Sequence, residues 1–121
     1  MKTAVVIDDN RQAADTLCEM LRFLDIEPHV AYGSRDGMTV LRDLTPDIVF
    51  LDISMPGVNG FEVMAYLRRY PQFEHTPVVF ISSDDQPETA QRARKTGALL
   101  LLIKPATMEA IEAVLVKAGL N

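Results

Sequence analysis

Four apolar residues lead directly into an aspartate and a turn-rich segment in the stretch Ile48-Val49-Phe50-Leu51-Asp52-Ile53-Ser54-Met55-Pro56-Gly57-Val58-Asn59-Gly60. A short apolar run bounded by turn residues is typical of a strand buried on both faces, as in a parallel sheet covered by helices. Asp52 then lies at the carboxyl end of this strand, where open α/β sheets place their ligand sites. A carboxylate there can act as a nucleophile that forms an aspartyl-phosphate. From this stretch alone, the alternative is that Asp52 starts a turn by bonding its own backbone.

The length and composition of the chain are those of one compact domain. The chain has 121 residues, and 48% of them are apolar. Its longest uninterrupted apolar run, residues 98–103, is too short for a membrane helix. The first apolar run ends at Asp8-Asp9, so no signal peptide is predicted, and the single cysteine, Cys18, offers neither a disulfide nor a metal-binding spacing. We therefore expect a cytoplasmic location, and the net charge of −5 argues against direct binding to nucleic acid.

The apolar pattern along the rest of the chain alternates between strand and helix. Strands are predicted over residues 4–7, 27–31, 48–51, 77–81 and 99–103. Helices are predicted over residues 11–25, 35–44 and 87–95, and two further helices are predicted to start at Phe61 and at Thr107. Ser34 and Thr107 are the expected N-caps of their helices, Pro87 suits a first turn, and Gly97 suits a helix end. Five βα repeats predict one parallel sheet with helices on both faces.

Polar residues follow four of the predicted strands. Asp8 and Asp9 follow the first strand, Asp52 the third, Ser82 the fourth and Lys104 the fifth. Because the carboxyl ends of the strands in a doubly wound sheet converge on one edge, we expect these side chains to share a crevice. Two like charges about 4 Å apart repel by roughly 4 kcal/mol at an effective dielectric near 20, so the carboxylates need a proton, a basic residue or a metal. Oxygen ligands suit Mg²⁺, Lys104 is a cation and Ser82 is a hydroxyl donor, which together match the needs of phosphoryl transfer to Asp52.

Each of these residues also has a purely structural interpretation. Asp8, Asp9 and Asn10 would cap the first helix, which is a common use of Asp and Asn. Ser82 would cap the turn that follows its strand, and Lys104, which precedes a proline, would be a solvated surface lysine. Their joint occurrence at the ends of several strands favours a common site.

Taken together, these residues resemble the receiver domain of a two-component response regulator. The matching residues are Asp8-Asp9, residues 51–57 with Asn59-Gly60, Ser82, and Lys104-Pro105, and the resemblance covers essentially residues 1–121 as a single receiver domain. It implies a flavodoxin-like (βα)₅ fold, an α/β architecture with a five-stranded parallel sheet in strand order 2-1-3-4-5 and helices on both faces. It also implies a cis peptide bond between Lys104 and Pro105.

The resemblance further implies a role for each site residue. Asp52 would accept a phosphoryl group from a sensor histidine kinase or a histidine phosphotransfer protein, Lys104 would pair with that group, and Ser82 would bond to it. The implied Mg²⁺ ligands are Asp9, Asp52 and the backbone carbonyl of Ser54, with Asp8 assisting partly through water. An output protein would bind the face formed by the fourth helix, fifth strand and fifth helix. The domain would catalyse only its own phosphotransfer and dephosphorylation.

One residue departs from the family pattern, and two other residues argue against other classes of protein. Leu101 stands where receivers usually carry Tyr or Phe, so the route by which the signal leaves is open. An aspartate-nucleophile phosphatase usually places a second aspartate where this chain has Ser54, and a flavin-binding module would need a phosphate loop where Asp8-Asp9 would repel phosphate. The chain would be either a stand-alone receiver or a module cut from a longer regulator or hybrid kinase, and Met1, close before the first strand, fits a natural N-terminus.

Overall fold

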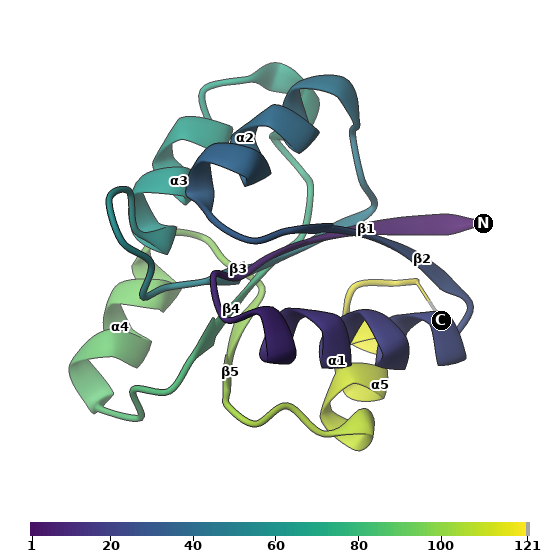
Figure 1. Ribbon diagram of the computed structural model, residues 1–121. Helices are drawn as coiled ribbons and strands as arrows, with labels where there is room; N and C mark the ends of the chain where they lie inside the picture. Colours follow the sequence, from purple (N-terminus) through teal and green to yellow (C-terminus); the bar gives the residue numbers. More distant parts are fainter. Residues whose placement is uncertain (121) are drawn as a thin grey trace.

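The computed structural model describes residues 1–120, in which five strands alternate with five α-helices (Figure 1). The strands are β1 (Lys2–Ile7), β2 (Ile26–Ala31), β3 (Ile48–Asp52), β4 (Val78–Ser82) and β5 (Leu100–Ile103). The helices are α1 (Arg11–Phe23), α2 (Ser34–Asp43), α3 (Gly60–Leu67), α4 (Pro87–Lys95) and α5 (Met108–Lys117), and a short 3₁₀ helix, η1 (Pro71–Phe73), follows α3. Within residues 1–120, no helix is both long and apolar enough to cross a membrane.

The sheet is parallel throughout and has the strand order β2-β1-β3-β4-β5, which confirms the predicted fold class. Every residue of β3 and β4 is buried, as the continuous apolar run of the third strand predicted. Ile7 lies opposite Leu51, and Asp52 lies opposite Ile81. The carboxyl ends of β1, β3 and β4 are therefore level with one another.

Two apolar cores form because successive residues of a strand point to opposite faces of the sheet. Val6 and Phe50 belong to the core under α1 and α5, whereas their neighbours Ile7 and Leu51 belong to the core under α2, α3 and α4. Figure 1 shows α1 and α5 on one side of the sheet and α2 and α3 on the other. The polar residues of the predicted site lie at the carboxyl edge of the sheet, outside these two cores.

The second strand has a weak sequence pattern because it contains Pro28. Proline has no backbone N–H to donate to a sheet and is found on edge strands. β2 pairs with β1 alone, so Pro28 lies on an edge of the sheet. The strand also starts one residue earlier than predicted, at the buried Ile26.

Two helix ends differ from the sequence-based prediction. Ser34 was the expected N-cap of α2, but Gly33 occupies the cap position and makes no side-chain cap bond, while Ser34 is buried in the first turn. α1 ends before Asp25, because that residue has a φ of 62°, in the left-handed region that a right-handed helix cannot include. The predictions for Thr107 as the cap of α5 and for Gly97, with a φ of 84°, just beyond α4 are confirmed.

Gly60 allows α3 to begin directly against the end of β3. A Cβ atom added at this position would lie 2.4 Å from the carbonyl oxygen of Asp52 and 2.8 Å from the Cα of Ile53. The Gly60 N–H also donates to the Ile53 carbonyl oxygen at 2.9 Å. Only glycine fits this close approach of two backbone segments.

We expect Gly60→Ala to lower the free energy of unfolding by roughly 2–3 kcal/mol, because the added methyl group meets backbone atoms that cannot rotate aside. Gly33→Ala is a matched control, since the added Cβ would meet no atom within 4 Å and the backbone is extended, with a φ of 165°. It should cost less than about 1 kcal/mol. Urea unfolding of both variants measures the difference, and equal losses would contradict the prediction.

Candidate functional site

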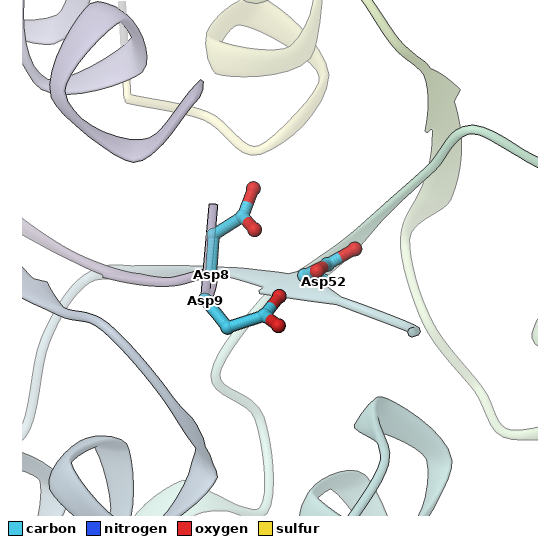
Figure 2. Close-up of side chains that lie close together, drawn as sticks. All are labelled: Asp8, Asp9 and Asp52. Atoms are coloured by element: carbon cyan, nitrogen blue, oxygen red, sulfur yellow. The ribbon is translucent and has the colours of Figure 1, made fainter. Parts of the chain in front are cut away.

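Asp8, Asp9 and Asp52 meet because β1 and β3 are neighbours in register. Ile7 and Leu51 are paired across the two strands, so the acidic residues that follow them emerge at the same edge of the sheet. One carboxylate oxygen from each of the three residues lies within 4.8 Å of the others. Figure 2 shows the three side chains together at the ends of β1 and β3. The structure thus brings together the carboxylates that the strand-end pattern predicted to share a crevice.

The carboxylate cluster is mostly withdrawn from solvent. Asp8 is 1% exposed and Asp52 is 3% exposed, whereas Asp9 is exposed. Burial removes the hydration that stabilises a charged carboxylate, so the two buried side chains need compensating partners. Asp8 has one in the N–H of Asn10, which donates to its Oδ1 at 2.9 Å.

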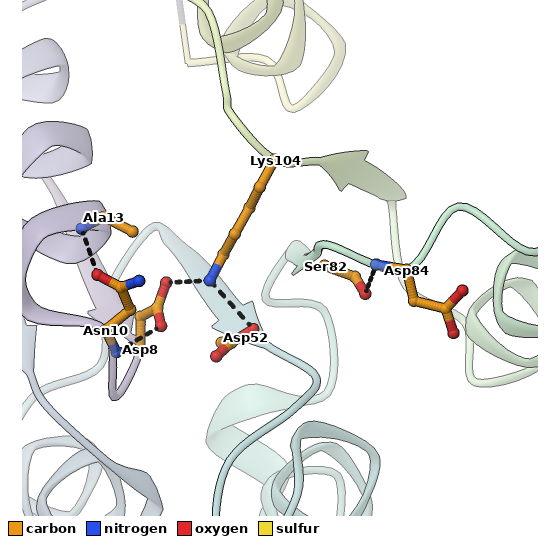
Figure 3. A network of polar contacts seen from close by, with 7 residues as sticks. All are labelled: Asp8, Asn10, Ala13, Asp52, Ser82, Asp84 and Lys104. Atoms are coloured by element: carbon orange, nitrogen blue, oxygen red, sulfur yellow. Dashed lines mark hydrogen bonds and ion pairs between the residues drawn. The ribbon is translucent and has the colours of Figure 1, made fainter.

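Lys104 supplies the positive charge of the site. Its Nζ lies 2.9 Å from Oδ2 of Asp8 and 3.5 Å from Oδ1 of Asp52, and the lysine side chain is 18% exposed. Figure 3 shows the lysine extending from the end of β5 to a point between the two carboxylates. The Lys104 N–H donates to the carbonyl of Ser82 at 2.8 Å, and the peptide bond to Pro105 is cis, as the resemblance implied.

The electrostatics of the cluster show an excess of negative charge. Burial, reinforced by hydrogen bonding and repulsion from Asp8 and by a hydrogen bond with Asp9, raises the pKa of Asp52 to about 7 although Lys104 lowers it. Burial of the ammonium lowers the pKa of Lys104, but bonding to Asp8 and attraction to Asp52 outweigh that effect, so its pKa is raised overall. One lysine therefore does not fully offset three carboxylates.

Ser82 lies at the same edge of the sheet but is engaged elsewhere. It ends β4, is 1% exposed, and its Oγ accepts the Asp84 N–H at 2.9 Å. In Figure 3 this hydroxyl is turned toward Asp84, away from Lys104 and Asp52. The oxygen accepts this bond through a lone pair, so the Ser82 O–H remains available to donate to another acceptor.

The structure also tests the purely structural interpretations of several residues. Asn10 alone caps α1, because its side-chain oxygen accepts the Ala13 N–H at 3.0 Å, which leaves Asp8 and Asp9 to the site. Lys104 is an ion-paired residue and not a solvated surface lysine. For Ser82 the structural interpretation holds in this conformation, since its hydroxyl does bond the following turn.

Three residues next to the site have bonding roles that the sequence pattern was not used to predict. Asn59 and Glu62 form a capping box, in which each side chain accepts the backbone N–H of the other, at 3.0 and 3.1 Å. The spacing Asn-x-x-Glu is the usual form of this motif and could have revealed it. The carboxylate of Asp84 accepts the Gln86 N–H at 2.9 Å and the Thr89 hydroxyl at 2.6 Å, so it holds the first turn of α4.

The site opens on two sides. A cavity of about 440 Å³ between α1 and the segment after β5 includes Asp8 and Lys104 in its lining. A second cavity, of about 580 Å³, lies between the β3–α3 loop and α4 and is lined in part by Ser54 and Ser82. The first cavity reaches Asp8 and Lys104 of the cluster, whereas the second reaches Ser54 and Ser82 beside it. The possible metal ligands of the cluster are all carboxylate oxygens, a set that suits a hard divalent cation.

The strand order, the two helical layers and the acidic edge define a doubly wound α/β domain with one polar site. The chain belongs to the response regulator receiver domain family, whose profile matches residues 4–116.

Known proteins of different lengths contain a similar domain. Protein RcaC of Microchaete diplosiphon is 33% identical over 84% of this chain, which spans only 16% of RcaC. Protein PilG of Pseudomonas aeruginosa is 30% identical over 87% of this chain and 78% of PilG. The structure of the chemotaxis protein CheY4 of Vibrio cholerae matches with a TM-score of 0.91 and 24% identity over 98% of both chains, which supports the fold.

We expect metal-free Asp52→Asn protein to be more stable than metal-free wild type at pH 8, by up to about 4 kcal/mol, and the difference to disappear toward pH 4. The pKa of Asp52 is raised from 3.8 to about 7 in the folded protein, so folding favours the protonated carboxyl group. The contribution of this group to the free energy of unfolding is therefore complete below pH 4 and is lost as the pH rises through 7. Asparagine carries no such charge. Urea unfolding in a chelating buffer at several pH values measures the difference, and a constant difference from pH 4 to 8 would contradict the assignment.

Proposed function

We propose that this domain is a phosphorylation-controlled signalling switch in which Asp52 accepts the phosphoryl group. The observation that carries the proposal is the contact of one lysine ammonium with two buried members of a cluster of three carboxylates. Such a site concentrates charge that a structural role does not require, and perturbed carboxylates of this kind are characteristic of functional sites. Membership of the receiver family supports the same conclusion.

The proposed reaction is a transfer from nitrogen to oxygen. A carboxylate oxygen of Asp52 attacks the phosphorus of a phosphohistidine, so that an O–P bond forms while the N–P bond breaks. The imidazole leaves with the electron pair and takes up a proton. The Lys104 ammonium pairs with the phosphoryl oxygens as charge develops on them, and the Ser82 O–H, whose oxygen accepts the Asp84 N–H, donates to one of them.

The proposed cofactor is Mg²⁺, held by the carboxylates of Asp9 and Asp52 and the backbone carbonyl of Ser54, with Asp8 assisting partly through water. The cluster fits this ion because its donors are oxygens and because Lys104 leaves negative charge uncompensated. When bound, Mg²⁺ supplies positive charge that offsets the carboxylates and the phosphoryl oxygens.

Hydrolysis of an external substrate by an aspartate-nucleophile phosphatase is the weaker candidate. Ser54 stands two residues after Asp52, where such an enzyme usually has its acid/base aspartate. A serine hydroxyl is a poor proton donor and acceptor at neutral pH compared with a carboxyl group. The proposed catalysis is therefore limited to phosphotransfer and dephosphorylation at Asp52 itself.

The proposed partners are proteins. A sensor histidine kinase or a histidine phosphotransfer protein would donate the phosphoryl group, which would place the domain in the cytoplasm. The proposed output face is formed by α4, β5 and α5, where a groove of about 380 Å³ includes Leu101, Ile103, Arg94, Lys117 and Asp85 in its lining. Within residues 1–120, neither Arg94 nor Lys117 forms an ion pair. In a chain of net charge −5, these cations support an acidic partner segment with apolar side chains.

Acetyl phosphate with Mg²⁺ should add one phosphoryl group to the wild type and none to Asp52→Asn, because an amide is a poor nucleophile. Lys104→Ala should take up the group at least tenfold more slowly, since a charge-assisted contact is worth roughly 1.5–3 kcal/mol. Intact-mass spectrometry follows the reaction. Asp85→Asn, which changes an exposed carboxylate outside the cluster, is the matched control and should react like the wild type. A phosphoryl adduct of equal amount on Asp52→Asn would falsify the assignment of the acceptor.

Mg²⁺ should raise the melting temperature of the wild type, because an ion that binds only the folded state stabilises it by mass action. The gain is about 1.4 kcal/mol at a free concentration ten times the Kd. Asp9→Ala combined with Asp52→Ala should abolish the increase. Thermal melts with and without millimolar Mg²⁺ make the comparison, with Ca²⁺ as a second hard cation. An increase that persists in the double variant would argue against the proposed ligands.

A further inference from the structure

An apolar cavity of about 130 Å³ lies between α2, the end of α3 and the 3₁₀ helix η1. Figure 1 shows α2 and α3 on the same side of the sheet, and the two helices contact one another. Because each helix returns the chain to the start of the next parallel strand, the carboxyl ends of α2 and α3 point away from the edge that carries Asp52. The proposed function makes no use of this cavity.

The inner wall of the cavity is formed by buried apolar side chains. Leu41 comes from α2, Val63 and Leu67 come from α3 and Phe73 comes from η1, and each is 5% exposed or less. A water molecule in a cavity needs roughly two to four polar partners, and these four side chains offer none. An apolar cavity of roughly 150 Å³ accommodates one benzene molecule. The space therefore suits an apolar group of about the size of one aromatic ring.

The wall that η1 contributes is held in place by hydrogen bonds. The Arg68 guanidinium donates to the carbonyl oxygen of Phe73, and the Phe73 N–H donates to the carbonyl oxygen of Tyr70 at 3.0 Å. Burial lowers the pKa of Arg68, as expected for a guanidinium partly withdrawn from water. Because this wall is already ordered, a ligand that enters the cavity has little ordering cost to overcome.

The outer rim of the cavity carries polar groups. Arg42, Tyr70 and Gln72 are exposed there, and Tyr66 is half-buried. The Tyr70 hydroxyl donates to the Tyr66 hydroxyl oxygen at 2.9 Å, so the Tyr66 O–H remains available to donate to a ligand. The hydrogen bond with Tyr66 raises the pKa of Tyr70, whereas the charges of Arg42 and Arg69 lower it. Both cations therefore act on the rim.

The charge of Arg42 is available to a ligand. Within residues 1–120, this arginine forms no ion pair. It lies in the last turn of α2, where it complements the helix dipole, but that dipole end is equivalent to only about half an elementary charge, so net positive charge remains. At the end of α3, the carbonyl oxygens of Met64, Tyr66 and Leu67 already accept backbone N–H groups. The rim therefore favours an anionic group.

We propose that this cavity binds a small carboxylate that carries one aromatic ring. The ring contacts the buried wall of Leu41, Val63 and Leu67, and the carboxylate pairs with the Arg42 guanidinium at the rim. A protein partner fits less well, because the cavity has room for only one side chain, whereas a stable interface buries roughly 800 Å² on each partner. The proposal does not depend on the role of Asp52, since the cavity is lined by other elements.

Benzoate and benzamide, which differ in charge but hardly in shape, test the site in the wild type. Titration with benzoate should shift the methyl NMR signals of Leu41, Val63 and Leu67, with a Kd of roughly 1 mM for a ligand of this size. Benzamide should bind at least about threefold more weakly, because it cannot pair with Arg42. Acetate, which has no ring, should leave these signals unchanged. Equal affinities for benzoate and benzamide would overturn the proposal. So would methyl shifts that follow the protein concentration and not the added benzoate, since they would show a second copy of the chain on the cavity.

Arginine variants identify the partner of the carboxylate. Arg42→Gln changes an exposed side chain and should remove the preference for benzoate over benzamide. Arg22→Gln is the matched control, because Arg22 is also exposed and lies in the last turn of α1, on the other side of the sheet, and it should keep the preference. A preference that persists in Arg42→Gln would contradict the proposal.

A variant that fills the cavity tests where the ring binds. Leu41→Phe adds volume to the inner wall and should weaken the binding of both compounds by at least about tenfold. Undiminished binding to a folded Leu41→Phe protein would place the ring elsewhere and overturn the proposal. If Leu41→Phe does not fold, the comparison of Arg42→Gln with Arg22→Gln still decides the outcome.

Discussion

The ammonium of Lys104 touches two buried carboxylates, at 2.9 Å from Asp8 and 3.5 Å from Asp52, and the geometry of the whole edge depends on this contact. β5 is separated from β1 by β4 and β3, so the lysine side chain joins the two outermost contributors to the site. Without this cation, two buried negative charges would face one another with nothing to offset their repulsion. The lysine therefore offsets part of the repulsion that arises where these strand ends converge.

The same contact leaves part of the negative charge of the site uncompensated. Only a cluster with such uncompensated charge gains free energy by binding a cation. The raised pKa of Asp52 records the remaining negative charge. Proteins commonly retain such costly arrangements where function depends on them, and compensate with a well-packed core. Here the compensation comes from β3 and β4, whose residues are all buried.

The helices differ in how firmly they are packed. α1 and α3 bury four and five residues, whereas α4 buries Ala93 alone. Elements with little buried apolar area open at low free-energy cost and are the ones that move in switches. The loop after β4 connects the carboxyl edge of the sheet to this weakly packed helix through a chain of hydrogen bonds. The weakly packed helix therefore lies next to the polar site.

The order of strands and helices could be predicted from the sequence because hydrophobic periodicity and helix caps are local properties of the chain. The apolar run before Asp52 and the Asp8-Asp9 pair after the first strand also located the carboxylate cluster, since parallel strands place their carboxyl ends at one edge. Only the tertiary structure decided that Asn10 caps α1, that Ser82 bonds Asp84, and that Arg92 rests on Phe61. A polar residue that caps a helix and one that lies in the site can have the same sequence pattern, so local chemistry alone could not separate these two roles. The contact between Arg92 and Phe61 joins two helices through side chains distant in sequence, and hydrophobic periodicity does not predict how two helices pack together.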